Sequence, residues 1–177
     1  MMQQYLRHRF LFEELVKRDF KKKYKRTVLG MAWSLLSPLL MLLVMKLVFT
    51  QFFGRTMEHY TIYLFCGNLV FSYFNESTSQ GMTSLVNNAA IFTKVNIPKY
   101  LFLFSKNVQT LINFSLTLCI FFVFCGLDHI LFTWKFLLLL YPVCLLVLFN
   151  IGVGLILSAL YVFFRDIQYL WGIFTQI

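Results

Sequence analysis

The most constraining feature of the sequence is an abrupt change from a cationic segment to a long uncharged one. Residues 17–26 read KRDFKKKYKR, and seven of these ten residues are Lys or Arg. Residues 27–45 then follow without a single charged side chain. A boundary of this kind is expected where a chain passes from water into the hydrocarbon of a membrane.

The composition indicates an integral membrane protein. Hydrophobic residues make up 59% of the chain and charged residues 13%, whereas soluble domains average roughly 45–50% and 25%. A soluble fold of this composition would expose apolar surface that it has too few polar residues to cover. The net charge of +9 does not indicate a nucleic-acid partner, because nine of the sixteen cations precede Thr27, directly beside the uncharged segment.

Apolar runs long enough to cross a membrane recur along the chain. Because about 30 Å of hydrocarbon takes about 20 helical residues, we predict an all-α, polytopic helical membrane protein. The last eleven residues reach only about 17 Å as a helix, so we expect a truncated domain with an incomplete fifth span. The predicted segments are an amphipathic interfacial helix at 4–26, spans at 29–53, 60–86, 103–127 and 136–162, a cytoplasmic helix at 88–98, and the start of span 5 at 167–177.

The cations also predict the orientation of these spans. With a cytoplasmic amino terminus, thirteen Lys and Arg residues fall on cytoplasmic segments. Only Arg55 and Lys135 then fall on the opposite side, and Lys46 lies within the first span. Short basic loops remain in the cytoplasm, so the amino terminus is expected inside the cell.

Residues 4–26 combine an apolar face with a cationic one. Phe12, Val16 and Phe20 recur every four residues, whereas Arg18 and Lys22 fall on the opposite side of a helix. A helix of this kind is expected to lie in the headgroup region of the membrane. Two interpretations remain open: an orientation signal that also binds anionic lipid, or a cationic platform for a lipid-linked diphosphate.

The second span carries seven polar side chains within an arc of about 120°, at 100° per residue. Polar side chains are costly against lipid, so they should face other helices or a water-filled cavity. The face is therefore either a helix–helix interface or the wall of a hydrophilic conduit. Its single carboxylate is a poor acid–base catalyst by itself. The seven polar residues are Asn87 and six candidate conduit-lining residues, Asn68, Ser72, Asn75, Glu76, Ser79 and Thr83.

The segment that follows the second span is unusually apolar for a cytoplasmic loop. It reads NNAAIFTKVNIP over residues 87–98, and Pro98 ends any short helix near Asn96 or Ile97. An exposed helix of two turns with an apolar face predicts contact with a partner protein.

The sequence contains no recognisable motif for nucleotide binding or catalysis. It lacks a GxxxxGK[ST] loop, paired carboxylates, a Cys–His pair and a GxSxG elbow. The four cysteines occur in apolar runs without CxxC spacing, and we interpret them as packing residues. We therefore predict neither an enzyme nor a metal site, and the energy for any transport must come from another subunit or an ion gradient.

The order of these motifs resembles the ABC-2 type permeases that export polysaccharides. The run LVKRDFKKKYKRTVLGMAWSLLSPLLMLLV is similar to that family's basic interfacial helix and its LGxxWxxLxPLL first span. The run YLFCGNLVFSYFNESTSQGMTSLVNNAAIFTKVNIPK is similar to the second span and the loop after it. The run GVGLILSALYVFFRDIQYL is similar to the fourth span and the start of the fifth, so the resemblance covers essentially the whole chain.

The resemblance implies a type V exporter-like transmembrane domain with six spans in the bacterial cytoplasmic membrane. It implies a homodimer of permease subunits above two ATP-binding cassette subunits, which bind Mg-ATP, so no cofactor is expected in this chain. The expected cargo is a glycan on undecaprenyl diphosphate, such as O-antigen or teichoic acid. The resemblance assigns ATPase coupling to Asn88, Ile91, Phe92, Thr93, Lys94 and Pro98. It assigns the lipid diphosphate to the interfacial helix, with Arg18, Lys21, Lys22, Lys25 and Arg26 as candidates.

Three other functions are compatible with parts of the pattern. An ABC-2 exporter of a small molecule or drug should lack a continuous polar face on its spans. A membrane enzyme acting on polyprenyl-linked sugars should carry clustered acids or histidines at one interface, and this sequence has only scattered ones. A membrane scaffold that transports nothing is the third alternative.

Overall fold

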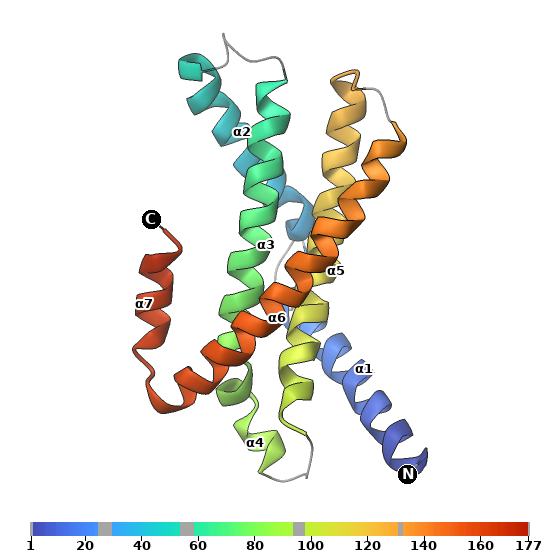
Figure 1. The fold of residues 1–177 in the computed structure, drawn as a ribbon, viewed down its shortest axis with the longest axis vertical. Helices are drawn as coiled ribbons and strands as arrows, with labels where there is room; N and C mark the ends of the chain where they lie inside the picture. Colours follow the sequence, from blue (N-terminus) through green and yellow to red (C-terminus); the bar gives the residue numbers. More distant parts are fainter. Residues whose placement is uncertain (1, 25–29, 54–58, 94–97, 131–132, 177) are drawn as a thin grey trace.

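The computed structural model describes residues 2–24, 30–53, 59–93, 98–130 and 133–176. Within these ranges the secondary structure is helical and no strand occurs, which confirms the predicted all-α fold class. The elements are α1 Met2–Tyr24, η1 Gly30–Ala32, α2 Trp33–Phe53, α3 Tyr60–Asn87, α4 Ala89–Phe92, α5 Tyr100–Leu127, η2 Trp134–Leu139, α6 Leu140–Phe163 and α7 Ile167–Phe174 (Figure 1).

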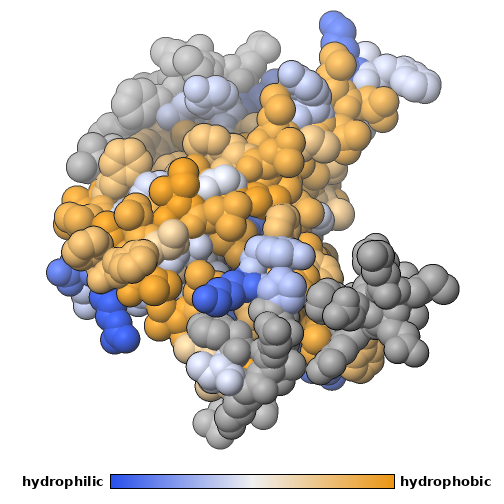
Figure 2. Space-filling model, turned by 60° about the horizontal axis from the view of Figure 1, so that its bottom comes forward, coloured by the Kyte–Doolittle hydropathy of each residue, from blue (hydrophilic) through white to orange (hydrophobic). Residues whose placement is uncertain are grey.

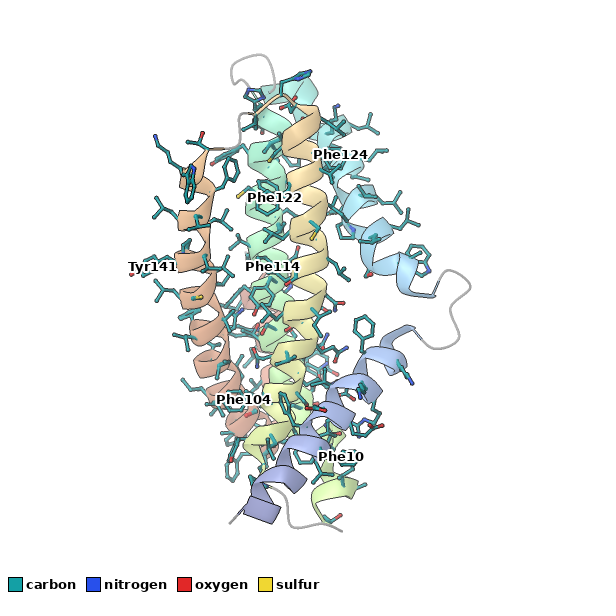
Figure 3. All side chains as sticks on the ribbon, turned by 90° about the vertical axis from the view of Figure 1, so that its right-hand side faces the viewer. Phe10, Phe104, Phe114, Phe122, Phe124 and Tyr141 are labelled. Atoms are coloured by element: carbon teal, nitrogen blue, oxygen red, sulfur yellow. The ribbon has the colours of Figure 1, made fainter. Side chains whose placement is uncertain are left out.

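The bundle is built around α3 and α5, which lie side by side along the long axis of the molecule (Figures 1 and 3). α6 crosses α3, and α2 packs against both α3 and α5. α1 lies across the lower end of α5, at the same end of the molecule as α4 (Figure 3). The segments predicted to be cytoplasmic, α1 and α4, are therefore neighbours in space.

α3 and α6 approach each other closely where both helices present small residues. A Cβ atom added to Gly81 in α3 would lie 3.4 Å from the Cα of Gly154 in α6. Ser77, Ser84 and Ser158 are buried within about one turn of these two glycines. Small side chains allow helix backbones to pack tightly, and this packing is a main source of helix association in membranes.

α3 and α5 are joined by a core of aromatic side chains. The ring centroids of Tyr73 and Phe114 are 4.5 Å apart, and those of Phe65 and Phe121 are 5.9 Å apart. Leu42 of α2 belongs to the same buried cluster. Aromatic pairs of this geometry contribute about 0.5–1.5 kcal/mol each beyond their buried area.

The outer surface has the character expected of a membrane protein. Among the described helices, α5 and the continuous segment Trp134–Phe163 are long and apolar enough to cross a membrane, and Trp33–Phe49 is a shorter apolar helix. Apolar residues cover most of the described surface visible in Figure 2, with hydrophilic side chains in small separate groups. α3 has 28 residues, or about 42 Å, but its polar side chains lower its mean hydropathy.

The observed helices differ locally from three of the predicted segments. The segment predicted as the fourth span, 136–162, begins within the short helix η2, Trp134–Leu139. The helix predicted at 88–98 is observed as a single turn, Ala89–Phe92, and residues 94–97 lie outside the described ranges. The first span begins with the short helix η1, where Gly30 has a φ of +50°, a conformation that glycine adopts without strain. The membrane crossing of each individual helix stays a prediction.

The contact between α3 and α6 can be tested with Gly81→Val. The added side chain would press on the backbone of α6 at Gly154, and such overpacking costs about 1–3 kcal/mol. Gly67→Val in the same helix is the matched control, because a Cβ atom there meets nothing within 4 Å. Thermal unfolding in detergent should show a clearly lower Tm for Gly81→Val than for Gly67→Val, and equal values would contradict the close approach.

Candidate functional site

A cavity of about 710 Å³, open to the surface, lies between α2, α3 and α5; it is called the polar cavity because polar side chains interrupt its otherwise apolar lining. Part of the polar face of α3 forms one wall, and hydroxyl and amide side chains of the other two helices face it. Pro38 lacks a backbone N–H and removes one hydrogen bond within α2 at this level. The lining residues are Trp33, Ser34, Ser37, Pro38 and Met41 of α2, Asn68, Leu69, Ser72, Tyr73 and Glu76 of α3, and Asn113, Phe114 and Thr117 of α5.

Glu76 is held in the wall of this cavity by amide donors. Its Oε1 accepts hydrogen bonds from Nε2 of Gln80 at 2.9 Å and from Nδ2 of Asn113 at 3.3 Å. The first donor belongs to α3 and the second to α5, so the carboxylate links the two central helices. The cavity thus combines a carboxyl group with hydroxyl groups, amides and the rings of Trp33 and Tyr73.

The structure divides the six candidate conduit residues into two groups. Asn68, Ser72 and Glu76 line the cavity. The other three lie at half-buried positions outside it and are bonded within α3. Oγ of Ser79 donates to Oδ1 of Asn75 at 3.3 Å, and Oγ1 of Thr83 donates to the carbonyl oxygen of Ser79, also at 3.3 Å.

The coupling residues implied by the resemblance cluster at the lower end of the bundle. Asn88 is buried at the junction of α3 and α4, where its Nδ2 donates to the carbonyl oxygen of Ser84 at 2.8 Å. Ile91 packs against a buried apolar pair, Leu15 of α1 and Phe102 of α5. Among the side chains described in and next to α4, those of Ala90 and Thr93 are exposed instead. Pro98 is half-buried, Phe92 is the last residue of α4, and Lys94 lies outside the described ranges.

The structure places three of the five candidate residues for a lipid diphosphate in α1. Lys21 is exposed on α1. Arg18 instead contacts other residues of the protein, namely Asp19 and Asn88. Lys22 lies in α1, whereas Lys25 and Arg26 lie outside the described ranges.

Three residues of this end of the molecule were not predicted from the sequence. Asp19 is only 2% exposed, and Nζ of Lys106 lies 3.1 Å from its Oδ2. Nε2 of Gln109 donates to the backbone oxygen of Asp19 at 3.3 Å. The available signal was Asp19 itself, the one acidic residue within the cationic run 17–26.

Comparison with known proteins identifies the family. Residues 11–177 match the ABC-2 type transporter family. The chain belongs to this family. It is 30% identical over 173 residues to the O-antigen export system permease protein RfbA of Myxococcus xanthus. This alignment covers 96% of this chain and 65% of the relative. It is 29% identical over 165 residues to an RfbA permease of Klebsiella pneumoniae, covering 90% of this chain and 63% of the relative.

Membership of the ABC-2 family agrees with the membrane protein inferred from the composition and the outward-facing apolar helices. The chain spans slightly less than two thirds of the length of these two relatives. The family match begins within α1 and includes α4 and the polar cavity, so the candidate regions all lie in the part shared with the family.

Water in the polar cavity can be tested by thiol labelling. In a variant without native cysteines, Ser72→Cys should react with a charged, membrane-impermeant thiol reagent at least about tenfold faster than Leu148→Cys, because the reactive thiolate requires water. Ser72 lines the cavity, whereas Leu148 is 65% exposed on the apolar outer surface of α6. Similar labelling rates at the two positions would mean that the cavity is not hydrated.

Proposed function

We propose that this chain is the permease subunit of an ABC transporter that exports a lipid-linked polysaccharide across the bacterial cytoplasmic membrane. The observation that carries the proposal is the match to the ABC-2 family over residues 11–177, together with relatives named as O-antigen export permeases. In this proposal the subunit does no chemistry itself. Two ATP-binding cassette subunits bind Mg-ATP and drive two copies of the permease.

The polar cavity supports a glycan as the cargo. Its hydroxyl and amide groups match the hydrogen-bonding groups of a sugar, and the exposed ring of Trp33 can stack on sugar C–H groups. A route for an apolar drug would not need a half-buried carboxylate such as Glu76 beside two amides. We propose that Asn68, Ser72 and Glu76 form part of the wall along which the glycan passes.

The lower end of the bundle supports a coupling role for α4. Ala90 and Thr93 are exposed there, beyond the last turn of α3. Lys21 is exposed on the neighbouring α1, where a cation attracts anionic headgroups at the membrane surface. We propose that α4 contacts the ATPase subunit and that α1, with its amino end in the cytoplasm, recruits the lipid diphosphate.

Transport of labelled lipid-linked glycan tests the function. Inside-out vesicles that contain the permease and its ATPase should move the glycan to the opposite leaflet only when ATP is hydrolysed. Movement of small solutes while the glycan stays in place would favour a drug exporter. Conversion of the glycan without the ATPase would indicate an enzyme, and no ATP-dependent movement of any solute would indicate a scaffold.

The coupling role of α4 can be tested with Ala90→Arg. Because Ala90 is exposed, the new side chain should leave the fold intact but obstruct a docked ATPase, which should lower ATPase affinity at least about tenfold. Ile91→Asp is a less specific test, since Ile91 packs inside the protein. Thr133→Arg adds the same charge at an exposed position just before η2, on the connection that follows the carboxyl end of α5, and serves as control. Normal co-purification and export by Ala90→Arg would exclude this face of α4 as the docking surface.

A further inference from the structure

One guanidinium group joins two separate helical elements at the lower end of the molecule. Nε and Nη2 of Arg18 in α1 donate to Oδ1 of Asp19 at 3.0 and 2.8 Å. Nη2 also donates to Oδ1 of Asn88 at 2.7 Å, and Asn88 marks the junction of α3 with α4. Arg18 therefore connects α1 to the start of α4 through a short hydrogen bond.

The α1 side of this contact is fixed to the bundle by a buried charge. Asp19 is 2% exposed, and besides Arg18 it is paired with Lys106 of α5 at 3.1 Å. Gln109, also of α5, donates to the backbone of Asp19. Separating one partner from a buried ion pair is strongly destabilising because it leaves an uncompensated charge. α1 is thus anchored to α5 on the side of the helix that carries Asp19.

The α4 side is held by an apolar contact as well as by the hydrogen bond. Leu15 of α1 and Phe102 of α5 form a buried pair, and Ile91 of α4 packs against it. Leu15 lies one turn before Asp19 on the same side of α1. α1, α4 and the lower end of α5 therefore meet at one junction with a polar and an apolar layer (Figure 3).

We propose that Arg18 is a positioning residue that clamps α1 to α4, so that a displacement of α4 moves α1 with it at the membrane surface. The part of this inference that concerns ATP-driven movement rests on the proposed function, whereas the clamp itself does not. In this role the guanidinium binds Asn88 and Asp19 of the protein rather than the phosphates of a lipid. Motion at the ATPase would then reach the interfacial helix without passing through the spans.

Four variants separate the clamp from other roles of the same side chains. Arg18→Gln removes the cation, and Asn88→Ala removes its acceptor while leaving every cation in place. Asn88→Asp keeps an oxygen that accepts from Arg18 but loses the hydrogen bond that Asn88 donates to the carbonyl oxygen of Ser84. It therefore shows how much the loss of this second bond, at the end of α3, contributes by itself. Lys17→Gln is the charge-matched control, because Lys17 is the exposed neighbour of Arg18 on α1.

Hydrogen exchange of the permease in lipid nanodiscs, without ATPase, tests the clamp directly. Arg18→Gln and Asn88→Ala should each accelerate exchange in α1 and in residues 88–93, about tenfold as expected for a charge-assisted hydrogen bond. The double variant should add little to either single change, because both break the same contact. Asn88→Asp and Lys17→Gln should exchange like the unaltered protein.

The ratio of ATP hydrolysed to glycan exported then tests transmission. It should rise roughly 2- to 30-fold in Arg18→Gln and Asn88→Ala, compared at equal amounts of permease and bound ATPase. An effect of Arg18→Gln that Asn88→Ala does not reproduce would overturn the clamp in favour of a direct lipid contact, and additive exchange effects would also overturn it. If the exchange results hold but no glycan moves in any variant, the proposed function fails while the clamp stands.

Discussion

The hydrocarbon core of a membrane contains no water, so polar side chains of a membrane protein find their hydrogen-bond partners within the protein, and several side chains of α3 do so. Oγ of Ser77 donates to Oδ1 of Asn107 in α5 at 2.7 Å, and Oγ1 of Thr78 accepts from Nε1 of Trp171 in α7 at 3.1 Å. Each of these bonds fixes how a neighbouring helix is rotated and how far along α3 it sits. Together with the close approach at Gly81, they make α3 the element around which α5, α6 and α7 are arranged.

The same requirement explains the polar cavity. The sequence left two interpretations of the second span open, a helix–helix interface and a conduit wall, and the side chains of α3 divide between the two environments. Ser77 and Thr78 are buried against other helices, whereas Asn68 and Ser72 line the cavity. Glu76 belongs to both, because its carboxylate lines the cavity and accepts a hydrogen bond from α5. A helix with this double character can join a helix–helix interface and line a cavity at the same time.

The cationic amino-terminal segment also has two sides in different environments. One side of α1 presents Leu15 and Asp19 to α5 and is buried, while Phe10 and Lys21 remain exposed toward the surroundings. The sequence predicted one apolar face, through Phe12, Val16 and Phe20, and this face is half-buried. The helix can therefore rest on a membrane surface and be fixed to the bundle at the same time, as the proposed clamp requires.

Periodicity and charge along the chain determined the helical class, the approximate helix bounds and the polar face of α3, because these depend on residues within a few turns of one another. Only the tertiary structure decided that Asp19 meets Lys106 and Gln109, the latter 90 positions away in the sequence. It also decided that Ile91 faces the bundle while Ala90 faces outward. Helical periodicity fixes which side chains share a face, but the partner of that face depends on how distant helices pack, and no local pattern encodes that packing.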